Sequence, residues 1–329
     1  MTPPDRPRLS FSPLGLGLAA LGRPGYINLN HAADLGHNYD VAAMEAHAHR
    51  VLDAAWAGGV RYFDAARSYG RAEPFLGSWL RARQVEAGAV TVGSKWGYTY
   101  TANWQVQAEH HEIKEHSLPV LQRQWAETQA NLGGYLDLYQ IHSATLDSGV
   151  LQNSAVLAEL ARLKGGGVAI GLSLSGANQA EVLARAIPLT VEGVRLFDAV
   201  QATWNLLEPS AGEMLAQARA AGMSIIIKEA LANGRLTPRN TAPEFAPKLA
   251  RLAEQARRLN SGIDALALAA VLAQPWVSVA LSGAATVEQL ESNLKATRVA
   301  WDDEAAAQLA ALAEPPAEYW QRRSSLAWN

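Results

Sequence analysis

Short apolar runs rich in β-branched residues recur along the chain, and each ends in polar residues or glycine. They lie at 60–66, 89–95, 135–142, 167–175, 197–203, 223–230 and 276–283. The run LGLGLAAL at 14–21 adds a first strand to this series. Runs of this length and composition are typical of strands buried on both faces, so the pattern predicts eight parallel strands.

Segments whose apolar residues have helical spacing lie between several of these runs. The clearest cover 40–59, 118–134, 156–167 and 210–222, and most close on glycine. Glycine after a last turn containing Lys, Arg or Asn is a common helix end. The alternation of eight strands with helices favours a (β/α)8 TIM barrel over a doubly wound sheet. We expect one barrel domain over 1–329, with extended irregular loops at 22–39 and 97–117 on the C-terminal face of the strands.

Composition narrows the classes of function. The chain has 329 residues, 49% of them hydrophobic and 18% charged, which suits a folded domain with a large core. Its net charge is −3 and no basic block is present, so nucleic acid is not an expected partner. No apolar stretch approaches the roughly 18 residues of a membrane span. The absence of cysteine fits a cytoplasmic location. The sequence does not indicate an oligomeric state.

Four polar residues stand at or just after the ends of the second, third and fourth predicted strands. They are Asp64, Tyr69, Lys95 and His142. The carboxyl ends of barrel strands converge on one face, so these side chains are expected to form one site. A phenol with a pKa of about 10 protonates a substrate at neutral pH only if its anion is stabilised.

The four residue types supply such a proton-transfer site. Lys95 would lower the pKa of Tyr69, Asp64 would hold Lys95 charged, and His142 would hydrogen-bond a substrate oxygen. Taken singly, each residue has an ordinary structural interpretation, which is the more common one for Asp64 and Tyr69. Asp64 would be a turn or cap residue, Tyr69 a packed aromatic, Lys95 a surface lysine and His142 a buried histidine. Their joint occurrence in this order favours the catalytic interpretation.

Three segments carry a resemblance to the aldo-keto reductase superfamily. They are FDAARSYGRAE at 63–73, SKWG at 94–97 and QIH at 140–142. The resemblance implies an (α/β)8 barrel that reduces aldehydes and ketones with a nicotinamide dinucleotide, usually NADPH. It also implies a tetrad of Asp64, Tyr69, Lys95 and His142, with Tyr69 as the general acid.

Later segments resemble the same family's cofactor motifs. GLSLSGANQ at 171–179 implies a nicotinamide contact from Ser173, although Leu174 replaces the family's Asn, and VQATWNLLEPS at 200–210 implies one from Gln201. IIKEALANGRLTPR at 226–239 carries Lys228 where the family has an aromatic residue, and we expect its ammonium to turn aside toward Glu229. Backbone amides of Glu229, Ala230 and Leu231 would hold the pyrophosphate.

The segment LSGAATVEQLESNLKA at 281–296 resembles the family's adenosine-end motif, a turn leading into a helix. Gly283, Gln289 and Asn293 match it. Ser292 replaces a common Glu, and the first helical turn has no Arg or Lys. Arg239 in the neighbouring loop would then be the partner of a 2′-phosphate, so NADP is the first expectation and NAD the alternative.

Aromatic residues in the two long loops are candidates for the substrate pocket. These are Tyr26, Trp96, Tyr98, Tyr100 and Trp104. The tail at 318–329 carries two tryptophans. It could close the pocket, pack elsewhere on the barrel or be disordered.

A metal site is not expected. His110, His111 and His116 lie near one another in sequence, but adjacent histidines point in different directions and no carboxylate completes a ligand set.

Three hypotheses for function remain at this stage. The first is an NAD(P)H-dependent oxidoreductase that reduces an aldehyde, ketone or sugar carbonyl. The second is a lyase or aldolase that forms a Schiff base on Lys95 or Lys228. The third is a cofactor-binding regulatory protein in which turnover is incidental.

Overall fold

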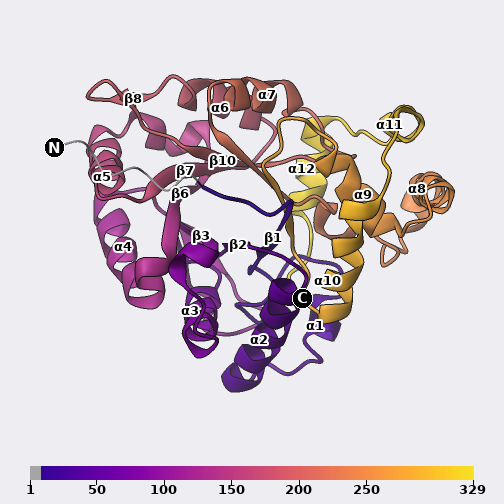
Figure 1. The fold of residues 1–329 in the computed structure, drawn as a ribbon, viewed down its shortest axis with the longest axis horizontal. Coiled ribbons are helices and arrows are strands. Elements are labelled where there is room, and N and C mark those ends of the chain that lie inside the picture. Colours follow the sequence, from indigo (N-terminus) through magenta and orange to yellow (C-terminus); the bar gives the residue numbers. More distant parts are fainter. Residues whose placement is uncertain (1–8) are drawn as a thin grey trace.

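Eight parallel strands close into a barrel in the computed structural model, which describes residues 9–329, and helices surround the strands (Figure 1). Residues 1–8, the start of the expected domain, lie outside the described residues. Each strand pairs with the next barrel strand in the chain, and the last pairs with the first. The barrel strands are β1 (Leu14–Gly17), β2 (Tyr62–Asp64), β3 (Thr91–Trp96), β6 (Leu136–Ala144), β7 (Ala169–Leu174), β10 (Ala199–Thr203), β11 (Ser224–Lys228) and β12 (Val279–Ser282). The (β/α)8 prediction is confirmed.

Helices follow most of the strands. They are α1 (His31–Asp34), α2 (Val41–Ala57), α3 (Ala72–Ala82), α4 (Leu118–Leu132), α5 (Ser154–Gly165), α6 (Gln179–Ala186), α7 (Gly212–Ala220), α8 (Ala246–Arg258), α9 (Ile263–Leu272), α10 (Val287–Leu294), α11 (Asp303–Ala310) and α12 (Pro316–Ser324). The four helices with clear spacing appear as α2, α4, α5 and α7. The spacing does not reveal α9, because that helix is apolar on nearly all sides. Within residues 9–329, no helix is both long and apolar enough to cross a membrane.

The two long loops are more regular than the sequence suggests. The first, at 22–39, contains α1. The second, at 97–117, contains an antiparallel hairpin of β4 (Tyr98–Tyr100) and β5 (Glu112–Lys114). A second small ribbon, β8 (Thr190–Val191) with β9 (Val194–Arg195), lies after α6. The expectation of irregular structure at 97–117 is therefore wrong, because these two short strands satisfy each other's backbone groups.

The interior of the barrel is filled by side chains from alternate positions of several strands. Tyr62 packs there with Leu138, Ala199 and Ile226. A Cβ atom on Gly93 would lie 2.5 Å from the Tyr62 hydroxyl, so glycine on the neighbouring strand makes room for this phenol. The layer of Tyr62 forms the floor beneath the carboxyl ends of the strands.

The buried carboxylate of Glu73, on α3, forms hydrogen bonds that connect this helix to β3 and α4. Glu73 is fully buried and accepts hydrogen bonds from Ser94 Oγ at 2.6 Å and Thr128 Oγ1 at 2.7 Å. Its second oxygen accepts from Asn131 Nδ2 at 2.9 Å and from Arg67 Nη1 at 2.7 Å. Four donors compensate the desolvation of this charge, so Glu73 fixes the segment that leads from β2 into α3.

Removing the charge of Glu73 should destabilise the barrel. We expect Glu73→Gln to lower the free energy of unfolding by about 3 kcal/mol, because Arg67 and the other donors lose their charged acceptor in a buried site. The matched control is Glu127→Gln, since Glu127 also pairs with Arg67 but its side chain is 34% exposed. The control should cost less than about 1 kcal/mol. Urea unfolding measures both, and equal losses would contradict the assigned role.

Candidate active site

The Asp64 carboxylate and the Lys95 ammonium form an ion pair inside the barrel at the ends of β2 and β3. Asp64 is 2% exposed and Lys95 is fully buried. Lys95 Nζ also donates to the carbonyl of Ala65 at 2.9 Å. A lysine tied in two directions has a fixed position, so the sequence prediction that Asp64 and Lys95 come together is confirmed.

Three further donors surround Asp64 Oδ1. Tyr62 Oη donates at 3.0 Å, Gln201 Nε2 at 2.9 Å and Gln140 Nε2 at 3.3 Å. The sequence interpretation missed Tyr62 and Gln140. Their inward positions on β2 and β6 follow from the two-residue alternation of strands, which was available as a signal.

Tyr69 lies in the tight segment between β2 and α3. The amide of Arg67 donates to the Lys95 carbonyl at 3.0 Å, and the amide of Tyr69 donates to Ala66 O at 3.1 Å. Gly70 follows with φ +60°, a left-handed conformation that glycine adopts without strain. This geometry brings the Tyr69 ring to 5.0 Å from Lys95 Nζ.

His142 reaches the same place through a bulge at the end of β6. The register with β7 shifts between Ile141 and Ala144, and Ser143 has φ 52°. Bulges re-aim side chains, and here the His142 ring meets the Tyr69 ring edge-on with centroids 5.5 Å apart. His142 Nδ1 lies 3.4 Å from Ser68 Oγ. The structure thus brings together all four residues of the expected tetrad.

Burial sets the protonation states of Tyr69 and His142. Burial, and then the Asp64 carboxylate, raise the pKa of Tyr69 above its ordinary value, while Arg23 lowers it. Burial, followed by the charges of Lys95 and Lys228, lowers the pKa of His142 well below its ordinary value. At neutral pH the site therefore holds a protonated phenol beside a neutral imidazole.

Arg23 is a buried cation that the sequence interpretation missed. It is 3% exposed, and its guanidinium carbon lies 5.1 Å from the Tyr69 ring centroid. Its Nη1 donates to the Ser68 carbonyl at 3.0 Å and pairs with Glu112 at 3.0 Å. Its Nε is buried without a partner. No local pattern marks Arg23, because its partners come from other parts of the chain.

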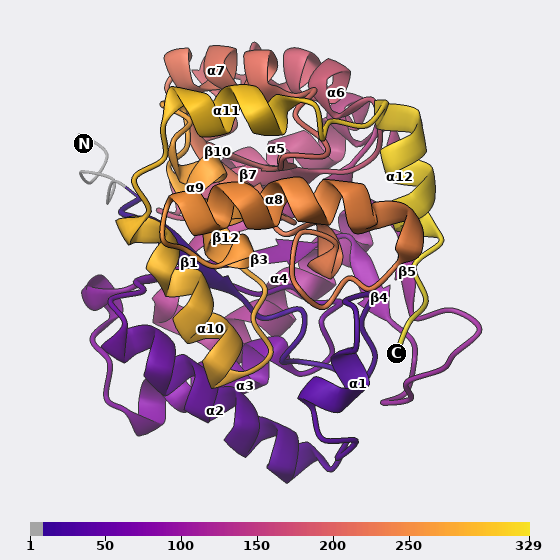
Figure 2. The same cartoon turned by 90° about the vertical axis from the view of Figure 1, so that its right-hand side faces the viewer.

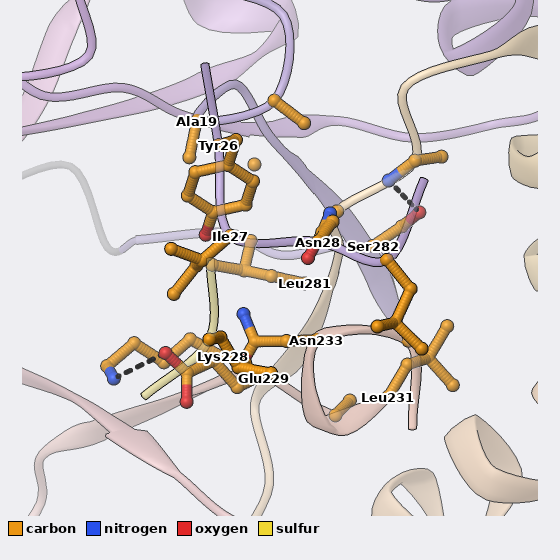
Figure 3. Close-up of a pocket in the computed structure, with 18 of the residues that line it drawn as sticks. Ala19, Tyr26, Ile27, Asn28, Lys228, Glu229, Leu231, Asn233, Leu281 and Ser282 are labelled. Atoms are coloured by element: carbon orange, nitrogen blue, oxygen red, sulfur yellow. Dashed lines mark hydrogen bonds and ion pairs between the residues drawn. The ribbon is translucent and has the colours of Figure 1, made fainter. Parts of the chain in front are cut away.

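One cavity of about 520 Å³ opens above the tetrad and extends toward α10. Figure 3 shows Tyr26, Ile27 and Asn28, from the loop after β1, across the cavity from Lys228, Glu229 and Asn233, which come from the end of β11 and the loop that follows it. Asn233 has a buried side-chain oxygen with no partner, which is an acceptor available to a ligand. Volume and shape suit a small-molecule or cofactor site.

Most residues expected to bind the cofactor line this cavity. They are Gln201, Lys228, Glu229, Ala230, Leu231, Arg239, Gly283, Gln289 and Asn293. Ser173 does not, since it is buried and its hydroxyl accepts from the amide of Ser143 at 2.8 Å. The expectation for Ser173 is corrected on this ground, whereas Ser143 and Ser175 do line the cavity.

Lys228 turns aside as the sequence predicts. Its Nζ donates to Thr203 Oγ1 at 2.8 Å and lies 3.7 Å from Glu229 Oε1 (Figure 3). Burial lowers the pKa of Lys228 to about 8. Burial raises the pKa of Glu229, but Arg323, paired at 2.7 Å, and Lys228 outweigh it and bring that pKa to about 2.

At the far end of the cavity, Arg239 is already paired. Its two terminal nitrogens contact the Asp34 carboxylate at 2.7 and 2.8 Å. Gln289 Nε2 donates to the same carboxylate at 2.9 Å. Asp34, which the sequence interpretation missed, thus joins the loop after β1 to the loop after β11 and to α10.

Two of the expected substrate aromatics line the cavity, namely Tyr26 and Tyr98. Trp96 does not, because Lys95 faces the barrel interior and the next residue of β3 must face the helices, where Trp96 is fully buried. Trp104 also lies away, with its indole nitrogen donating to Tyr39 O at 2.6 Å. Tyr100 is not among the lining residues. The expectation that Trp96 and Trp104 contact substrate is corrected.

The C-terminal segment covers the cavity. Figure 2 shows it running from α12 past β4 and β5 toward α1. Trp328 lines the cavity and stacks on His111, with centroids 3.8 Å apart. Asn329 exchanges backbone hydrogen bonds with Tyr26 at 3.1 Å in both directions. Trp320 packs beneath α12 in the hydrophobic cluster of Tyr319 instead.

The three histidines near the hairpin lie in different surroundings. His110 is exposed beside Glu109, His111 stacks on the tail, and His116 contacts the carbonyl of His142 at 2.9 Å. Among the described residues, no group of three potential metal ligands gathers here or elsewhere.

Comparison with known proteins agrees with this architecture. A sequence model described as the Aldo/keto reductase family matches residues 13–314. The aldo-keto reductase str7 of Strobilurus tenacellus is 24% identical over 320 residues, which cover 91% of this chain and 87% of that protein. Pyridoxal 4-dehydrogenase of Microbacterium luteolum is 26% identical over 327 residues, with coverage of 88% and 90%.

A solved structure shares the fold. The aldo-keto reductase AKR11C1 from Bacillus halodurans, in its holo form, superimposes with a TM-score of 0.69 at 21% identity, over 94% of this chain and 96% of that one. The family match extends over nearly the whole chain, from the start of β1 to the segment before α12. The chain therefore belongs to the aldo/keto reductase family, whose members are oxidoreductases.

Proposed function

We propose that the protein reduces the carbonyl group of an aldehyde, ketone or sugar with a nicotinamide dinucleotide, and that Tyr69 is the general acid. The observation that carries this proposal is the buried cluster of Asp64, Lys95, Tyr69 and His142 at one end of the cavity. When bound, the cofactor supplies a hydride to the carbonyl carbon. The chain's own residues supply the proton.

Tyr69 is suited to donate that proton because it is protonated at neutral pH and lies among cations. Donation from Oη to the substrate oxygen leaves a phenolate, which the ammonium of Lys95 and the guanidinium of Arg23 stabilise. Their charge centres lie 5.0 and 5.1 Å from the ring centroid. His142, neutral and edge-on to the ring, can donate a hydrogen bond to the same substrate oxygen while Nδ1 faces Ser68.

The cavity fits a nicotinamide dinucleotide in shape and donor set. It continues from the tetrad to α10, and the unpartnered side-chain oxygen of Asn233 offers an acceptor along the way. Gln201 would hold the nicotinamide amide, and Glu229, Ala230 and Leu231 would hold the pyrophosphate through their backbone. We further propose that one domain carries all these functions, because the family match covers residues 13–314.

Replacing the acid should slow the reaction strongly and leave the cofactor bound. Tyr69→Phe should lower kcat/KM for carbonyl reduction by a factor on the order of 10³, because only the proton donor is lost. Activity is measured with a panel of aldehydes, ketones and sugars. This carbonyl panel should include pyridoxal, since a relative is named pyridoxal 4-dehydrogenase. Tyr98→Phe is the matched control, because it removes another cavity phenol, and its effect should stay below about tenfold. Retention of full activity by Tyr69→Phe would contradict the assignment.

Removing the charge of Arg23 should shift the pH profile of the reverse reaction, alcohol oxidation. Alcohol oxidation needs Tyr69 as phenolate, so its rate rises with pH toward the Tyr69 pKa. Arg23→Met removes a cation that lowers that pKa and should shift the profile upward, with a smaller shift in Arg23→Lys. Reduction uses the phenol and should slow without a comparable shift.

The control for this test is Arg71→Met. Arg71 lies 5.9 Å from the Trp104 ring centroid and does not line the cavity, so the profile should stay in place. A merely structural role for Arg23 would lower the rates without moving the profile, and that result would count against the electrostatic assignment.

One observation bears on the alternative of a Schiff-base lyase or aldolase. Burial lowers the pKa of Lys228, which lies in the cavity wall, to about 8. A neutral amine in a cavity can form a Schiff base with a carbonyl substrate. Borohydride reduction in the presence of the carbonyl panel would then leave a covalent adduct on Lys228. We expect no adduct, because Lys228 Nζ is bound to Thr203 and lies beside Glu229. Trapping that disappears in Lys228→Arg would support the lyase hypothesis instead.

A further inference from the structure

The two ends of the cavity differ in their balance of charge. At the tetrad end, the lining cations Arg23, Lys228 and Arg323 are balanced by the lining carboxylates of Asp64, Glu112 and Glu229. At the far end, the lining side chains of the described chain include two carboxylates, Asp264 and Glu288, and a single cation, Arg239. A dinucleotide whose nicotinamide lies beside Tyr69 must extend its adenosine toward this far end. The charges there therefore act on the adenosine ribose.

Arg239 is engaged on several sides. Besides its two contacts with the Asp34 carboxylate, at 2.7 and 2.8 Å, its Nη2 donates to the carbonyl of Asn30 at 3.1 Å. The Asp34 side chain is 9% exposed and that of Arg239 is 30% exposed, so the carboxylate is the more buried partner. A phosphate that binds Arg239 must share the guanidinium with this bidentate carboxylate or displace it, and in either case it remains beside a negative charge.

Gln289 holds the other side of Asp34. Its Nε2 donates to Asp34 Oδ1 at 2.9 Å, and its Oε1 accepts from the amide of Ala285 at 2.9 Å. Both ends of the amide are therefore in use, and Asp34 is held in place from α10 as well as from Arg239. The carboxylate is therefore fixed between Arg239 and Gln289, both of which line the cavity.

The beginning of α10 is also satisfied by the chain itself. Thr286 Oγ1 accepts from the amide of Gln289 at 3.3 Å. The backbone amide of Glu288 and the hydroxyl of Thr286 hold the pKa of the Glu288 carboxyl below its usual value. The positive end of this helix, which would otherwise attract a phosphate, thus already faces a carboxylate.

We propose that this end of the cavity selects NADH over NADPH and that Asp34 is the residue that determines the choice. A free 2′-hydroxyl can donate to a carboxylate, whereas a 2′-phosphate would bring up to two negative charges beside Asp34, Glu288 and Asp264. The inference rests on the proposed function, because it needs a nicotinamide dinucleotide in this cavity. It reverses the expectation from sequence, where Arg239 is counted as a free partner for a 2′-phosphate.

Binding alone tests the inference. Tryptophan fluorescence, which Trp328 in the cavity wall should report, is titrated with NADH and with NADPH. We expect the Kd for NADPH to exceed that for NADH by about tenfold or more in the wild-type protein. A Kd for NADPH equal to or below that for NADH would overturn the proposal. Binding of neither nucleotide would overturn the proposed function itself.

Substitution of Asp34 tests whether this residue determines the preference for NADH over NADPH. In Asp34→Asn the ratio of the two Kd values should fall by about tenfold, mainly through tighter NADPH, because Arg239 is released. The double variant Asp34→Asn, Arg239→Gln should lose that gain. Glu291→Gln is the matched control, since it removes one carboxylate from α10, the helix that carries Gln289, at a position that does not line the cavity, and the ratio should not change. An unchanged ratio in a folded Asp34→Asn protein would overturn the role of Asp34.

Discussion

The buried ion pair between Asp64 and Lys95 is the interaction on which the site depends. Two charges inside a barrel lose their hydration, and their attraction compensates only if the remaining hydrogen-bonding capacity is satisfied. Here Tyr62, Gln140 and Gln201 donate to one oxygen of Asp64 while Lys95 occupies the other. One carboxylate thus fixes the positions of three interior side chains from three different strands. Gly93 leaves the space that Tyr62 needs to reach this carboxylate.

The electrostatics of Tyr69 depend on segments outside the strands. Arg23 comes from the loop after β1, Glu112 from the hairpin, and Trp328 from the C-terminal segment, and all three meet beside the phenol. Arg23 lies 4.7 Å from the Trp328 ring and is held by Glu112, so its charge stays near Tyr69. These loops close over a barrel whose strand ends are already fixed, which lets substrate recognition vary without disturbing the buried pair.

The barrel and the tetrad were predictable because both follow from short-range patterns. Apolar runs identify buried strands, and the ends of parallel strands meet on one face, so Asp64, Lys95 and His142 were expected to converge. Arg23 and Asp34 were not predictable, because their partners lie 45 and 205 positions away, at Ser68 and Arg239. Trp96 was misassigned although strand alternation opposes it, since Lys95 and its neighbour cannot both face the interior.

The most direct test of the account is a crystal structure of the protein with a nicotinamide dinucleotide and an unreactive carbonyl analogue. The account predicts the analogue's oxygen within about 2.6–3.2 Å of Tyr69 Oη, with His142 as its second partner. An analogue bound away from Tyr69, or joined covalently to Lys228, would contradict the assignment of Tyr69 as the acid.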